Sequence, residues 1–88
     1  MRERFDEIRA EIAENDAAIV AAVNHRLALV MELWALKAQL GYETVDPDRE
    51  RSLRETLAAA NVGLLSPAGL DRLLTDLLDL TKQELGAG

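Results

Sequence analysis

The feature that most constrains the fold is the first part of the chain, residues 1–40, which contains neither proline nor glycine. Its apolar residues recur at spacings of three, four and seven: Phe5, Ile8, Ile12, Ile19, Val23, Leu27, Val30 and Trp34. This spacing is typical of an amphipathic α-helix. We therefore predict one helix from about Glu3 to Leu40, roughly 55 Å long at about 1.5 Å per residue. The alternative is two helices with a break near Asn15 and Asp16.

Two turn segments, residues 41–47 and 61–67, divide the rest of the chain. Each contains a glycine and ends in Asp-Pro or Ser-Pro, a pair that is typical of an N-cap followed by the first helical residue. The pattern predicts two shorter helices, about Pro47–Ala60 and Pro67–Glu84. Alanine and leucine dominate and aromatic residues are only 3% of the chain, which favours helices over strands. We expect one all-α domain over residues 1–88.

Two short helices cannot cover a rod of that length. The rod far exceeds the ~13 Å radius of gyration of a compact 100-residue domain, and a chain this small buries only a modest share of its surface alone. We therefore predict a partner chain along the long helix. A two-fold homodimer is the commonest arrangement of this kind.

Composition excludes several functions. Ten Lys and Arg against 16 Asp and Glu give a net charge of −6, which argues against binding nucleic acid or anionic lipid. With no cysteine and one histidine, we expect no thiolate or histidine-rich metal site. The first residues lack the apolar core of a signal peptide, and Glu32 interrupts the longest apolar run, Leu27–Leu36. We expect no membrane span and a soluble, cytoplasmic protein.

Cations that interrupt the apolar faces are the candidate functional residues. Arg26 and Lys37 are eleven residues apart and share one face of the long helix with Leu33. Arg9 is seventeen residues before Arg26, so it points about 100° away at a distance of about 25 Å and would serve a partner chain's pocket more easily. Buried cations need counter-ions, and a small ligand with two carboxylates would supply them. The alternative is that each cation snorkels or is simply solvated.

The segment Asp46-Pro47-Asp48-Arg49-Glu50-Arg51 is the second candidate. Helix-starting chemistry explains Asp46, Pro47 and Asp48. It does not explain Arg49, a cation in the first turn that shares a face with the later leucines. A surface pair between Glu50 and Arg54 is one assignment for Glu50.

Taken together, these pieces resemble the small, all-helical chorismate mutases over nearly the whole chain. The resemblance is carried by Ile8-Arg9-Ala10-Glu11-Ile12, Asp16, His25-Arg26-Leu27, Lys37 with Gly41, and Val45-Asp46-Pro47-Asp48-Arg49-Glu50. It implies an intertwined homodimer with two identical sites. It also implies an isomerase that rearranges chorismate to prephenate, in the shikimate-derived synthesis of phenylalanine and tyrosine, without a cofactor.

The resemblance implies a role for each matching residue. Arg26 would hold one substrate carboxylate and Arg9 of the partner subunit the other. Lys37 would donate to the ether oxygen of the breaking bond, and Glu50 would accept from the ring hydroxyl. Four further residues would lie near the substrate: Leu33, Asp46, Arg49 and Thr81. A pericyclic reaction needs only a substrate held in a reactive shape and donors fixed where charge develops, and these residues suit that need.

One position departs from the family. A Gln or Glu normally follows the small polar residue by one turn as a second donor, but Leu85 stands there. Gln83 or Glu84 would replace it only if the helix register slipped. The departure lowers the expected catalytic efficiency. Two other functions stay open: an isochorismate pyruvate-lyase on the same fold, and a non-catalytic helical dimer or interaction module. Activation by a partner enzyme is compatible with the sequence, but no residue pattern in it identifies such a partner.

Overall fold

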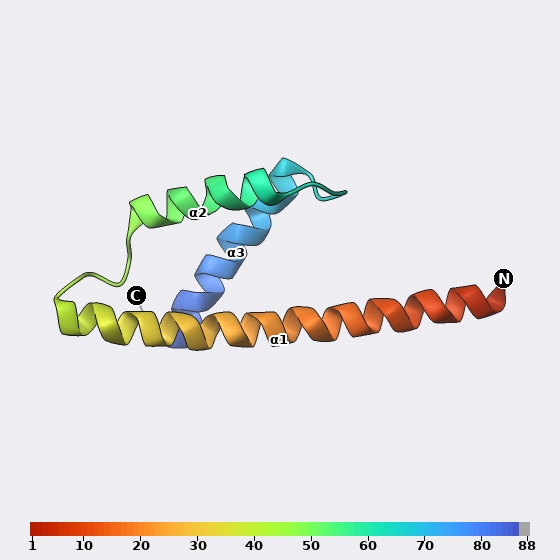
Figure 1. Cartoon of the computed structure of the whole chain (residues 1–88), viewed down its shortest axis with the longest axis horizontal. Helices are drawn as coiled ribbons and strands as arrows, with labels where there is room; N and C mark the ends of the chain where they lie inside the picture. The colour runs from red at the N-terminus through yellow and green to blue at the C-terminus, as the bar shows by residue number, and fades with distance from the viewer. Residues whose placement is uncertain (87–88) are drawn as a thin grey trace. The chain divides into compact units, whose positions relative to one another are not determined.

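A computed structural model describes residues 1–86 of the chain and contains three helices. They are α1 (Arg2–Leu40), α2 (Pro47–Ala60) and α3 (Pro67–Leu85), drawn in Figure 1. The three-helix, all-α prediction is confirmed. The boundaries of α2 are as predicted, and α1 and α3 each extend one residue beyond the predicted range.

The first helix is continuous from Arg2 to Leu40, as Figure 1 shows. The alternative of a break near Asn15 is therefore wrong. The helix ends at Gly41, whose φ of 75° lies in the left-handed region. There the Gly41 N–H donates to the Ala38 carbonyl at 3.3 Å and the Tyr42 N–H donates to the Lys37 carbonyl at 2.8 Å. These two bonds form a Schellman motif, which favours glycine at this position because glycine has no Cβ.

No residue of α1 is buried within the chain. By length and composition α1 is also apolar enough to cross a membrane, so the expectation that no segment would qualify is wrong. Glu32 and Arg26 are too few charges to disqualify the window around them. The same test is passed by helices whose apolar face is covered by protein. Composition alone therefore does not distinguish between these two environments.

The chain divides into two compact units, Met1–Leu33 and the described residues from Trp34 onwards. In the second unit α2 and α3 pack against each other. The core is small: Leu70 and Leu74 of α3 are 9% and 3% exposed. The side of α2 that faces α3 is half-buried, and its residues follow one another at spacings of three and four. Its members are Glu50, Leu53, Arg54 and Leu57.

Both short helices begin as the sequence predicts. The Asp46 side chain accepts from the backbone N–H groups of Asp48 and Arg49, and the Ser66 hydroxyl accepts from the Gly69 N–H at 2.9 Å. Each cap is followed directly by proline, which has no N–H to satisfy. This capping fixes where α2 starts, and therefore where Glu50 lies.

Polar contacts join α2 to α3 at two places. Arg54 donates to the Asp71 carboxylate at 2.6 Å and to the Thr75 hydroxyl at 3.0 Å. Glu50 forms an ion pair with Lys82 at 3.4 Å. The predicted surface pair between Glu50 and Arg54 is therefore wrong. Each residue instead pairs with a residue of the neighbouring helix.

Candidate active site

Lys37 lies in the last turn of α1 and is half-buried. Its carbonyl is held by the Schellman motif, and its Nζ donates to the Thr44 carbonyl at 3.3 Å. A lysine at a helix C-terminus is favoured by the negative end of the helix dipole. The backbone of Lys37 is thus fixed, while a hydrogen bond to a loop carbonyl directs its ammonium.

A pocket of about 480 Å³ lies at this end of α1. Its lining comes from the end of α1, the connecting loop and the start of α2: Lys37, Gly41, Tyr42, Glu43, Val45, Asp46 and Pro47. The pocket is closer to an open surface depression than to an enclosed cavity. Two predicted site residues, Lys37 and Asp46, therefore line one pocket.

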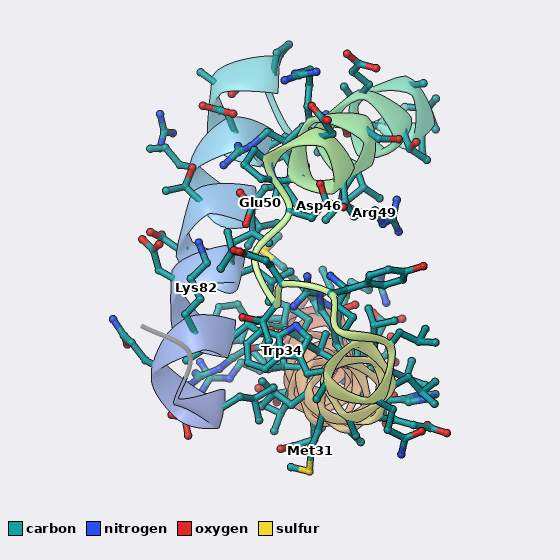
Figure 2. The ribbon with its side chains drawn as sticks, turned by 90° about the vertical axis from the view of Figure 1, so that its left-hand side faces the viewer. Met31, Trp34, Asp46, Arg49, Glu50 and Lys82 are labelled. Atoms are coloured by element: carbon teal, nitrogen blue, oxygen red, sulfur yellow. The ribbon has the colours of Figure 1, made fainter. Side chains whose placement is uncertain are left out.

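In the first turn of α2 a glutamate and an arginine lie on different sides of the helix. Glu50 is half-buried and Arg49 is exposed. Figure 2 shows Glu50 on the side of α2 that faces α3, with Arg49 pointing away from α3. Glu50, rather than Arg49, thus extends the half-buried face of Leu53 and Leu57. Arg49 is left accessible to a ligand or to another chain.

The last two predicted site residues, Thr81 and Leu85, lie at the end of α3, which is a continuous helix there. Thr81 is 4% exposed and its hydroxyl donates to the Leu77 carbonyl at 2.8 Å. Leu85, one turn later, is half-buried, whereas Gln83 and Glu84 are exposed. The helix continues to Leu85 without a slip. Within the described residues, Leu85 therefore shares the covered side of α3 with Thr81, and Gln83 and Glu84 do not.

Arg9 lies on an exposed apolar surface near the start of α1. Its guanidinium lies over the Phe5 ring at 5.5 Å, a cation–π contact one turn along the helix. Phe5 is 50% exposed, and Ile8 and Ile12 are 41% and 54% exposed. Arg9 is itself exposed. The contact holds the Arg9 side chain against a surface that stays exposed among the described residues 1–86.

The predicted residues fall into the two units. Arg9, Arg26 and Leu33 belong to Met1–Leu33, and the others belong to the second unit. Arg26 is half-buried and Leu33 is 46% exposed. Within the second unit the structure joins Lys37 to Asp46 through one pocket and Glu50 to α3 through Lys82.

Sequence reasoning missed Lys82. A signal for it existed, because Lys82 follows Leu78 by four residues and precedes Leu85 by three. It therefore interrupts an apolar helix face, which is the criterion that singled out Arg26 and Lys37. The structure adds what spacing could not, namely the partner: the Glu50 carboxylate on α2.

Comparison with known proteins identifies one family. A family model described as chorismate mutase type II matches residues 8–84, which is most of the chain. Neither curated proteins nor solved structures gave a match. The matched range includes every predicted site residue except Leu85.

Proposed function

The chain belongs to the chorismate mutase type II family, and from this premise we propose that it works as a two-fold homodimer whose sites each take Arg9 from the partner subunit. The reaction is the rearrangement of chorismate to prephenate. One ether C–O bond breaks and one C–C bond forms within a single molecule. The observation that carries the proposed site is the pocket shared by Lys37 and Asp46 at the junction of α1 and α2.

In the proposed site two arginines bind the two substrate carboxylates. Arg26 binds one and Arg9 of the partner subunit binds the other, each with the paired N–H groups that suit a carboxylate. Binding both ends of a flexible substrate holds its reacting carbons at bonding distance. Such positioning removes much of the entropy cost from the reaction step.

Lys37 would supply the electrostatic part of catalysis. Negative charge grows on the ether oxygen as the C–O bond stretches, and a fixed ammonium stabilises it. The Lys37 Nζ donates to the Thr44 carbonyl at 3.3 Å. A substrate oxygen would compete for the same ammonium protons. Glu50 accepts a hydrogen bond from the ring hydroxyl and so fixes the ring.

The dimer is supported by the surface of α1. Large apolar side chains along it are 41% to 64% exposed: Phe5, Ile8, Ile12, Ile19, Val20, Leu29, Met31, Leu33, Leu36 and Leu40. A surface this apolar and this long is unusual for a monomer and marks an interface. Arg9 lies within it. A two-fold arrangement would place the same surface of each chain against the other.

The proposal also places the enzyme in the cytoplasm. The chain has no cysteine and so needs no oxidising compartment to fold.

The test is turnover. Purified protein should consume chorismate, followed by loss of its ultraviolet absorbance, and prephenate should be the product. Release of pyruvate and salicylate from isochorismate would instead identify a lyase. An interaction module would show neither activity, and chorismate would not raise its melting temperature.

A further inference from the structure

We propose that Lys82 is a positioning residue for this reaction, because it neutralises and holds the Glu50 carboxylate so that a substrate with two negative charges can bind beside it. The inference rests on the proposed function, since it requires Glu50 to face the substrate. It adds a residue that the family resemblance did not assign.

The first support is the burial of the pair. The Lys82 Nζ lies 3.4 Å from the Glu50 Oε1, and the two side chains are 33% and 31% exposed. The other ion pairs described in residues 1–86 each include a carboxylate that is far more exposed: 64% for Glu7, 63% for Glu11, 85% for Asp48 and 70% for Asp71. Partial burial removes water from both charges, so the Glu50–Lys82 interaction is screened less than these.

The second support is the way both ends of the pair are fixed. Glu50 lies in the first turn of α2, whose start is set by the Asp46 cap. Lys82 lies in the last turn of α3, where its carbonyl accepts from the Gly86 N–H at 2.9 Å. A carboxylate at a helix N-terminus and an ammonium at a helix C-terminus are each favoured by the helix dipole. Figure 2 shows Glu50 on the side of α2 that faces α3.

The third support is charge. The chain carries a net charge of −6, and the proposed substrate carries two carboxylates. An unpaired Glu50 carboxylate in the site would repel that substrate, and the repulsion is larger where water is partly excluded. The positive charge of Lys82 balances the negative charge of the Glu50 carboxylate, so the pair has no net charge. The 3.4 Å contact is to Oε1, and because a carboxylate has two acceptor oxygens, Oε2 would accept from the ring hydroxyl.

A double-mutant cycle tests the inference. The variants are Lys82→Met, which keeps the side-chain length and removes the charge, Glu50→Gln, and the two combined. Lys82→Met should raise KM about tenfold and change kcat less, because repulsion from Glu50 acts on substrate and transition state alike. In the Glu50→Gln background the same change should alter kcat/KM by less than about twofold. Lys82→Arg should restore most of the wild-type KM.

Arg54→Met is the matched control. Arg54 also joins α2 to α3, through Asp71 and Thr75, but it has no proposed contact with substrate. Its loss should lower the melting temperature and leave KM within about twofold. Circular dichroism and melting curves on every variant separate misfolding from altered binding.

Several results would overturn the inference. An equal effect of Lys82→Met in both backgrounds would show that Lys82 acts independently of Glu50. A KM unchanged by Lys82→Met would remove the role altogether, and so would an equal KM change in the Arg54→Met control. Wild-type protein that fails to turn over chorismate would overturn the proposed function, and this inference with it.

Discussion

Residues 1–33 and the described residues from Trp34 onwards are stabilised in different ways. In the first region Arg4 donates to Glu7 and Glu11 of the same helix. No residue of α1 is buried. In the second region Leu70 and Leu74 form a core, and ion pairs cross from α2 to α3. The backbone hydrogen bonds of the first region's helix are local, but only packing against other elements covers its apolar face.

The largest expected effect tests whether Arg9 in the first region contributes to the site of the partner subunit. Arg9→Ala and Arg26→Ala should each reduce activity nearly to background. In the proposed dimer, each change would remove from every site one of the two arginines that bind the substrate carboxylates. Mixed and refolded together, the two variants should regain activity. In a heterodimer one of the two sites then has both arginines.

The measurement is kcat/KM on the mixture, with the heterodimer fraction determined by native mass spectrometry. Each variant refolded alone is the control. Heterodimers that form without recovering activity would show that the arginines act within one chain.

The next effect tests the chemistry assigned to the second region. Lys37→Ala should lower kcat by about 10²–10³-fold or more, the range for losing one donor to a developing negative charge. KM should change less, because this charge develops mainly in the transition state. Steady-state kinetics on chorismate measure both constants. A change confined to KM would assign Lys37 to substrate binding rather than to catalysis.

A stability comparison separates the two regions directly. Leu74→Ala empties the α2–α3 core and should cost about 2–5 kcal/mol. Ile19→Asp places a charge on the exposed surface of α1 and should weaken assembly instead. The melting temperature of the wild type should fall on dilution, because folding and association are linked.

Melting curves over a hundredfold range of protein concentration provide the readout, with light scattering for the mass. The melting temperature of Ile19→Asp should depend more steeply on protein concentration than that of Leu74→Ala. A stable, folded monomer of 9.7 kDa in the wild type would contradict the proposed dimer.

The smallest effect concerns the end of α3. Leu85→Gln would place an amide one turn after Thr81 on the same side of the helix, and a second donor there should raise kcat about tenfold, the equivalent of about 1–1.5 kcal/mol. Gln83→Ala and Glu84→Ala should have little effect, because both side chains are exposed. A large loss in either alanine variant would show that the last turn rearranges when substrate binds.

The sequence predicted what depends on neighbouring residues and failed where the partner lies far along the chain. The Asp46-Pro47 and Ser66-Pro67 pairs gave the starts of α2 and α3, because an N-cap is a local hydrogen-bonding arrangement. Helical spacing offered Arg54 as one possible partner for Glu50, yet its partner Lys82 is thirty-two residues away. Spacing within one helix carries no information about which residue a second helix presents.

The candidate site shows the same limit. The order and spacing of Arg9, Arg26, Lys37 and the segment from Asp46 to Glu50 carried the family resemblance, which the match over residues 8–84 confirms. The shared pocket of Lys37 and Asp46 required the loop geometry around Gly41. That geometry follows from a left-handed glycine, for which the sequence gave only the residue type.

The continuous helix α1 also sets the order of events in folding. Its backbone hydrogen bonds are local, so the helix can form within microseconds. In the proposed dimer its apolar surface is covered only when a second chain arrives, and that step is limited by diffusion and orientation at typical rate constants of about 10⁵–10⁷ M⁻¹s⁻¹. At micromolar concentration encounter is therefore slower than helix formation by several orders of magnitude. The refolding rate should rise in proportion to chain concentration, and the exposed intermediate should be the species most prone to aggregate.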